Sequence, residues 1–216
     1  MMDKKKLLTG TIVAFVALSI LYFLPVDLSF KKSFPLALLL AASFCLQSWP
    51  IVAAMLFSLA GDVAGDLHRF LPQMGCFAVA HVFFIGYFLS LAWKRKRAKE
   101  APVKGWWFAL VTLAVVALYY QASEKVIPCA PEGAVRTGMY VYAGLLVVMM
   151  WSALMLRDWM WGLGAVLFVF SDLVLAVNRF VSPVPGERFL IMVPYYAAQL
   201  LIFTRAALER RKAFRP

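Results

Sequence analysis

Four ionisable side chains lie inside long apolar stretches of this sequence: Asp62, Asp66, His81 and Asp172. An aspartate at the centre of a membrane helix costs about 2.5 to 3.5 kcal/mol on the insertion scale, and serine or asparagine would join helices at a lower cost. Such residues therefore indicate a functional site. Because Asp66 is close to a helix end, a paired structural role is equally expected for it, and Asp62 and Asp172 are the main candidates.

Several polar groups share one depth in the predicted helices. At 1.5 Å per residue, Asp62 lies roughly 7 Å below the outer end of its helix, and Asp172 and His81 lie roughly 9 Å below theirs. Tyr142 falls at roughly 6 Å and Tyr196 at roughly 10 Å by the same count. A common depth permits a single site built from several helices.

Helical spacing brings further polar side chains toward this layer. Tyr195 and Tyr196 precede Gln199 by four and three residues, so both can approach it on one helix face. Arg179 follows Asp172 by two turns, which would let its long side chain extend toward the carboxylate. We expect these groups to support the aspartates.

Buried acidic residues and a histidine suit three kinds of function. They are found as acid–base catalysts, as proton relays in transporters and as metal ligands. The chain lacks the paired interrupted helices and the repeat of many secondary transporters. Only one histidine lies in the membrane layer, and no histidine-rich spacing supports zinc. The transporter and the metal-dependent hydrolase remain alternatives to a metal-free enzyme, for which we expect no cofactor.

The apolar stretches predict an all-α bundle of about eight transmembrane helices in a single domain, 1–216. The predicted spans are 7–24, 34–47, 51–66, 75–93, 105–121, 138–156, 159–178 and 189–207. The second and third are short for a span, which needs about 20 residues. Ser48-Trp49-Pro50 separates them, since proline cannot continue a helix across its missing donor. The Lys4–Lys6 run and the apolar segment after it have a signal-peptide character, but no cleavage motif follows and we expect a retained helix.

Composition excludes several classes of protein. Of 216 residues, 63% are hydrophobic and only 15% are charged, which is too few to coat a soluble domain of this size. The net charge of +11 comes from short basic runs between apolar stretches, so a nucleic-acid partner is not expected. The three cysteines, Cys45, Cys76 and Cys129, have no metal-binding spacing and are expected to be free.

The basic residues also predict an orientation. If the N-terminus is cytoplasmic, fifteen lysines and arginines fall on inside segments and seven on outside segments. The inside set includes Lys4–Lys6, the run from Lys94 to Lys104 with Lys99, and the C-terminal group with Arg215. We therefore expect an integral membrane protein, in a bacterial cytoplasmic membrane, with both termini in the cytoplasm.

Several runs of residues resemble a known family. They are Leu59-Ala60-Gly61-Asp62-Val63, Phe77 with Ala80-His81 and Tyr87, Val141-Tyr142-Ala143, the stretch from Gly164 through Ser171-Asp172 to Asn178-Arg179-Phe180, and Tyr195-Tyr196-Ala197-Ala198-Gln199-Leu200-Leu201. Together they are similar to the YhhN-like lysoplasmalogenase family of small multi-pass membrane hydrolases. Ala80 and Phe84 depart from residues that are common in that family.

The resemblance implies hydrolysis of the vinyl ether bond of a lysoplasmalogen to a fatty aldehyde and a glycerophospho-alcohol. Protonation of the vinyl β-carbon gives an oxocarbenium-like cation, which a carboxylate can stabilise while it draws a proton from water. Two aspartates in an apolar layer suit these roles, as paired carboxyls do in glycosidases. The expected catalytic residues are Asp62 and Asp172, in either order. The expected supporting residues are Lys32, Asp66, His81, Tyr142, Ser171, Asn178, Arg179, Tyr195, Tyr196 and Gln199.

A lysophospholipid substrate also fits the predicted depth. Its single tail can lie among apolar helices, and a bond at the top of that tail would sit some 7 to 10 Å deep. Lys32, Arg179 and Arg188 are expected at headgroup level, where a phosphate would lie. Simple snorkelling to the membrane surface explains these three cations equally well. Membrane lipid is the other expected partner, and the oligomeric state stays open.

Overall fold

The computed structural model describes residues 3–98 and 103–213. These residues form eight α-helices and one short 3-10 turn, with no strand among them. In chain order they are α1 (Lys4–Phe23), α2 (Phe34–Leu46), α3 (Trp49–Asp66), α4 (Phe70–Arg97), α5 (Gly105–Lys125), η1 (Ile127–Cys129), α6 (Ala134–Met155), α7 (Trp159–Phe180) and α8 (Glu187–Ala213). The all-α prediction is confirmed. Lys99 and Arg215, which the orientation prediction counts, lie outside the described residues.

Local sequence explains where several helices begin. Asp3 caps α1 by accepting a hydrogen bond from the Lys5 N–H, and Asp158 caps α7 through the N–H groups of Met160 and Trp161. Prolines occupy the first turns of α2 and α3, where no intrahelical donor is required. The break at Ser48-Trp49-Pro50 is therefore real, and α3 begins at Trp49 rather than at Ile51.

Both predicted boundaries of the fourth helix need correction, and α5, α6 and α8 also extend beyond their predicted spans. α4 begins at Phe70, five residues before the predicted start, because Pro72 is tolerated in a first turn. It also continues to Arg97, so Lys94–Arg97 form its last turn, where cations favourably oppose the negative end of the helix dipole. The early start brings Gln73 into a helix that the sequence prediction placed after it.

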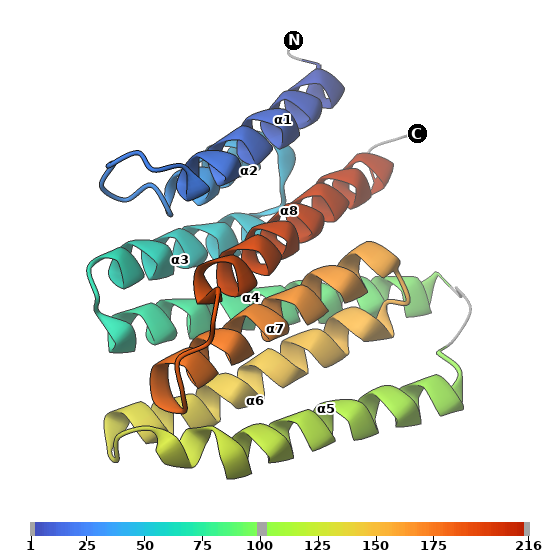
Figure 1. The fold of residues 1–216 in the computed structure, drawn as a ribbon. Coiled ribbons are helices and arrows are strands. Elements are labelled where there is room, and N and C mark those ends of the chain that lie inside the picture. Colours follow the sequence, from blue (N-terminus) through green and yellow to red (C-terminus); the bar gives the residue numbers. More distant parts are fainter. Residues whose placement is uncertain (1–2, 99–102, 214–216) are drawn as a thin grey trace.

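The helices alternate in direction and pack side by side (Figure 1). α4 packs between α3 and α6, and α7 packs between α6 and α8, while α1 and α2 cover one side and α5 lies at the opposite edge against α6. The start of α1, the end of α4, the start of α5 and the end of α8 lie at one end of the bundle. The first and last helices thus have the chain termini at the same end of the bundle, as expected for an even number of spans.

Six helices of the described chain are long and apolar enough to cross a membrane: α1, α4, α5, α6, α7 and α8. α2 has 13 residues and is about 20 Å long, well short of a hydrocarbon core of about 30 Å. About eight spans is thus roughly compatible with the structure, with α2 and α3 as the shorter elements.

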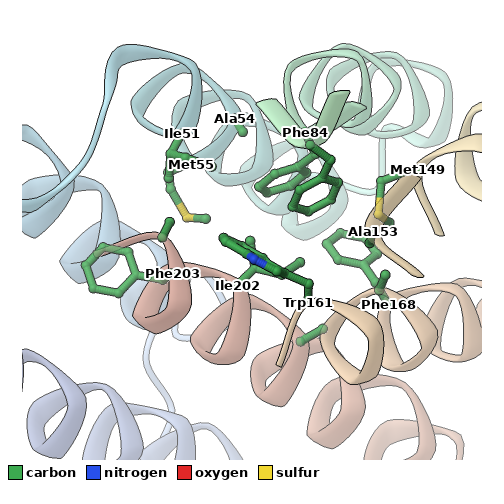
Figure 2. Packing of buried hydrophobic residues seen from close by; sticks show 14 of the residues in the cluster. Ile51, Ala54, Met55, Phe84, Met149, Ala153, Trp161, Phe168, Ile202 and Phe203 are labelled. Carbon is green, nitrogen blue, oxygen red and sulfur yellow. The ribbon is translucent and has the colours of Figure 1, made fainter. Parts of the chain in front are cut away.

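The bundle is apolar both inside and outside. Trp161, Phe84, Phe168 and Met149 are fully buried where α4, α6 and α7 meet, next to Ile202 of α8 (Figure 2). Large apolar side chains also project outward, including Leu113 and Phe44, each 69% exposed. An apolar exterior around a packed core is expected when lipid is the solvent.

Candidate functional site

Asp62 of α3 and Asp172 of α7 line the same cavity. It is a partly open cavity of about 250 Å³ between the end of α1, the α1–α2 connection, α3, α4, α7 and the start of α8. Its polar lining consists of Tyr22, Lys32, Asp62, Gln73, Ser171, Asp172, Glu187, Arg188 and Tyr195, and its apolar lining of Phe77, Leu175, Ile191 and Met192. Within the described residues, this cavity holds the two strongest candidates from the sequence.

A tyrosine on another helix orients each aspartate. The hydroxyl of Tyr195 donates to Asp62 Oδ2 at 2.9 Å, and that of Tyr142 donates to Asp172 Oδ2 at 2.7 Å. Gln199 Nε2 lies 3.5 Å from the Tyr195 hydroxyl, at the limit of a hydrogen bond. Each bond uses one carboxylate oxygen, so the other oxygen is not engaged by the tyrosine.

Two glycines beside the aspartates on α3 make room for other lining residues. A methyl group at Gly61 would come within 2.8 Å of the Phe77 ring. A methyl group at Gly65 would come within 2.6 Å of Lys32 Nζ and 2.8 Å of Gln73 Nε2. The Gly-Asp-Val-Ala-Gly-Asp sequence therefore allows an aromatic ring and two polar groups to approach the helix closely.

The end of the cavity next to the α1–α2 connection and the start of α8, called its outer end below, holds two cations, Lys32 and Arg188, beside two carboxylates, Asp66 and Glu187. Lys32 Nζ lies 3.6 Å from Asp66 Oδ1, and Ser33 donates to Asp66 Oδ2 at 2.8 Å. The hydroxyl of Tyr196 donates to the Lys32 carbonyl at 2.8 Å, which ties the α1–α2 connection to α8. Asp66 thus has the structural pairing that its place near a helix end suggested.

Arg188 provides a second cation at this end. Its guanidinium donates to the Tyr22 carbonyl and stacks on the Tyr22 ring, 4.7 Å from the centroid. Glu187, beside it in the chain, also lines the cavity. The outer end therefore offers two cationic groups and one carboxylate to a ligand.

Ser171 joins α7 to α8 next to Asp172. Its hydroxyl donates to the Ile191 carbonyl at 2.9 Å, close to Pro194, which removes one backbone donor inside α8. Ser171 therefore lines the cavity and also holds the proline-containing turn of α8.

Other predicted residues lie outside the cavity. His81 is fully buried one turn below Phe77, bonded through Nδ1 to the Phe77 carbonyl, with its ring packed edge-on against Tyr142. Asn178 Oδ1 accepts the Val184 N–H and shapes the α7–α8 loop. His81 therefore packs against residues next to the cavity, and Asn178 fixes the loop that leads into α8.

The expected approach of Arg179 to Asp172 is corrected by the structure. The Arg179 guanidinium lies over the Phe70 ring, 4.5 Å from its centroid, and does not line the cavity. Arg188, at the start of α8, lines the cavity and Arg179 does not.

Sequence reasoning missed Tyr22, Gln73 and Glu187. Tyr22 and Glu187 are at helix ends, where polar residues are common, and therefore gave no signal. Gln73 lay in a segment predicted as a loop; the tolerance of a first helical turn for Pro72 is the signal that would have placed it in α4. Across 3–98 and 103–213, no three His, Cys, Asp or Glu residues are grouped as a metal site would require.

The arrangement is suited to acid–base chemistry on an amphiphilic molecule. Two carboxyl groups from different helices line one partly open cavity, each held by a phenol, and cations lie at its outer end. A protonated and an ionised carboxyl on either side of a bound molecule can respectively donate and accept protons.

The chain is similar in sequence to known proteins. The chain is 34% identical over 177 residues to lysoplasmalogenase TMEM86A from Homo sapiens, covering 74% of this chain and 66% of that protein. It is 32% identical to lysoplasmalogenase TMEM86B from Mus musculus, covering 74% and 64%, and to the TMEM86B from Homo sapiens, covering 62% and 52%. The chain thus spans two thirds or less of the length of these curated relatives.

No solved structure matches the chain significantly. A model of the YhhN family matches residues 26–206, which include both aspartates, both tyrosines that bind them and the basic end of the cavity. The chain belongs to the YhhN family.

Proposed function

We propose that this chain is an integral membrane hydrolase that cleaves the vinyl ether bond of lysoplasmalogens, with Asp62 and Asp172 as the acid–base pair. The observation that carries the proposal is that both aspartates line one cavity, each with a tyrosine hydroxyl on its carboxylate. The names of the TMEM86A and TMEM86B relatives supply the substrate class.

The reaction begins when one carboxylic acid protonates the β-carbon of the vinyl ether. The C=C bond is consumed, and the positive charge spreads over the α-carbon and the ether oxygen. The second carboxylate stabilises this cation, as paired carboxylates do around the oxocarbenium-like states of glycoside hydrolysis.

Water then adds to the α-carbon and gives a proton to the carboxylate. The product of this addition is a hemiacetal. The hemiacetal collapses to the fatty aldehyde and the free glycerol hydroxyl. One water is consumed, and each carboxyl can return to its starting state by proton transfer between them or through water.

The two ends of the cavity match the two ends of such a substrate. Lys32 and Arg188 can bind the phosphate, and Glu187 can face a cationic headgroup amine. In the proposed orientation, this end faces outward and both termini are cytoplasmic, as the distribution of basic residues predicts.

The proposal is tested by an aldehyde-release assay on the purified protein. Lysolipids that carry a vinyl ether, an alkyl ether or an ester at the same position are offered in matched micelles. We expect aldehyde from the vinyl ether alone. Fatty acid from the ester and no aldehyde would replace the proposal with an esterase, and substrate binding without any product would favour a transporter.

A further inference from the structure

A second, apolar cavity lies beside the polar one. It encloses about 90 Å³ between α4, α5, α6 and α7, and its lining is almost entirely hydrocarbon. Its deep end is formed by Leu118 of α5, Val147 of α6 and Val169 of α7. No residue of this deep end lines the polar cavity.

The two cavities share a wall. Gln73, Phe77, Asp172 and Leu175 line both of them, so the Asp172 carboxyl lies at the junction between a polar and an apolar space. The Tyr142 side chain, which holds this carboxyl, faces the apolar cavity. If one molecule occupied both cavities, the junction between its polar part and its apolar part would lie next to Asp172.

The apolar cavity is long enough to contact part of a lipid tail. Its lining on α6 runs from Met139 to Val147, which is about 12 Å at 1.5 Å per residue. An extended carbon chain advances roughly 1.2 Å per bond, so the lining runs beside about ten bonds of a tail, which the partly open cavity contacts without surrounding completely. α5 closes one side of the cavity, and Leu118 is the innermost residue that this helix contributes to the lining.

We propose that the apolar cavity binds the hydrocarbon tail of the lysolipid and thereby sets which chain lengths are cleaved. This inference rests on the proposed function. The tail then lies along Leu118 and Val147, and the headgroup lies at Lys32 and Arg188. In this position the vinyl ether bond is at Asp172, where the two cavities meet.

A pair of neighbouring substitutions tests the proposal. Val147→Phe fills the deep end of the cavity, whereas Val148→Phe adds the same ring one position later at a residue that is 45% exposed to lipid. For Val147→Phe we expect kcat/KM to fall about tenfold or more for long alkenyl chains and to stay near wild type for short ones, since pocket size discriminates chain length in this range. Val148→Phe should keep the wild-type profile. An identical chain-length profile for Val147→Phe and wild type would overturn the proposal.

A direct binding measurement does not depend on turnover or on the folding of a variant. Wild-type protein is photolysed with an alkyl-ether lysolipid that carries a diazirine in the middle of its tail, and the labelled peptides are found by mass spectrometry. We expect labels on Leu118, Val147 or Val169. Labels confined to lipid-facing positions such as Leu113 and Val148 would refute a tail site here. Failure of the proposed function instead means no aldehyde from any chain length in the wild type, whatever the crosslinks show.

Discussion

The hydroxyl of Tyr195 donates a 2.9 Å hydrogen bond to Asp62 Oδ2, across 133 positions of the sequence and between α8 and α3. Tyr142 makes the equivalent contact with Asp172, between α6 and α7. Four helices therefore hold two carboxyl groups through two phenols. A hydrogen bond contributes about 1.5 to 3 kcal/mol when the carboxyl group is ionised and about 0.5 to 1.5 kcal/mol when it is neutral, so each tyrosine restricts the orientation of its carboxyl group.

Removal of either aspartate's ionisable group should nearly abolish turnover. Asparagine keeps the shape of the side chain but can neither deliver the proton nor carry the charge. We expect Asp62→Asn and Asp172→Asn each to lower kcat by about 100- to 10,000-fold, measured by aldehyde release. Asp27→Asn, at an exposed position outside the cavity, is the matched control.

The double variant Asp62→Asn/Asp172→Asn should be hardly slower than either single one, because groups that act as a unit have non-additive effects. The wild-type rate should also pass through a maximum with pH, which reports the pair rather than either residue. Near-normal aldehyde release by folded single variants would end this mechanism.

Loss of the tyrosine hydroxyls should weaken catalysis less severely. Tyr195→Phe and Tyr142→Phe each remove one hydrogen bond to a carboxyl and keep the ring packing. We expect kcat to fall by roughly ten- to a hundredfold with KM little changed, consistent with the loss of one charge-assisted bond. Tyr140→Phe, on the exposed side of α6, should be neutral. A larger effect on KM than on kcat would mean that the tyrosines bind substrate instead of orienting the aspartates.

The cations of the outer end should act on binding. Arg188→Ala removes a guanidinium that lines the cavity, so KM should rise about tenfold while kcat stays within about twofold. Arg179→Ala should raise KM by less, because its side chain lies over Phe70 and outside the cavity. Equal KM values for wild type and Arg188→Ala would remove the phosphate contact from the proposal, and the exposed Arg69→Ala serves as the control.

Gly65→Ala should disturb the site without unfolding the protein. The added methyl group meets the flexible ends of Lys32 and Gln73, which can shift. We expect kcat/KM to fall about tenfold, in line with about 1 to 3 kcal/mol for a displaced polar group. Gly86→Ala is the matched control, since its new methyl group meets open space in α4. Equal activity of the two variants would show that the close approach at Gly65 has no role.

Membrane orientation can be tested with single cysteines. In a variant whose Cys45, Cys76 and Cys129 are replaced, Lys96→Cys is expected on the cytoplasmic side and Glu132→Cys, with a side chain 86% exposed, on the outer side. An impermeant thiol reagent added to intact cells should label Glu132→Cys alone. Labelling of Lys96→Cys from outside would reverse the orientation and place the cavity on the cytoplasmic side.

Several features follow from the sequence by itself. Long uncharged stretches predict membrane helices, because lipid cannot satisfy exposed backbone groups and apolar side chains must face it. Aspartates within those stretches identify Asp62 and Asp172 as candidates, since an unneeded charge there is costly. Helical rise also places both at a common depth. These inferences use only composition, spacing and distance along one helix.

Lateral neighbours were decided by the tertiary structure. Depth and helix face do not say which of seven other helices lies opposite, so the pairing of Tyr195 with Asp62 and of Tyr142 with Asp172 depends on long-range packing. The same packing, with close approaches at Gly61 and Gly65, brings Gln73 and Arg188 to the site and leaves Arg179 on Phe70. It also divides the interior into a polar and an apolar cavity at Asp172, because the space between helices is set by how their side chains interlock and not by any one segment.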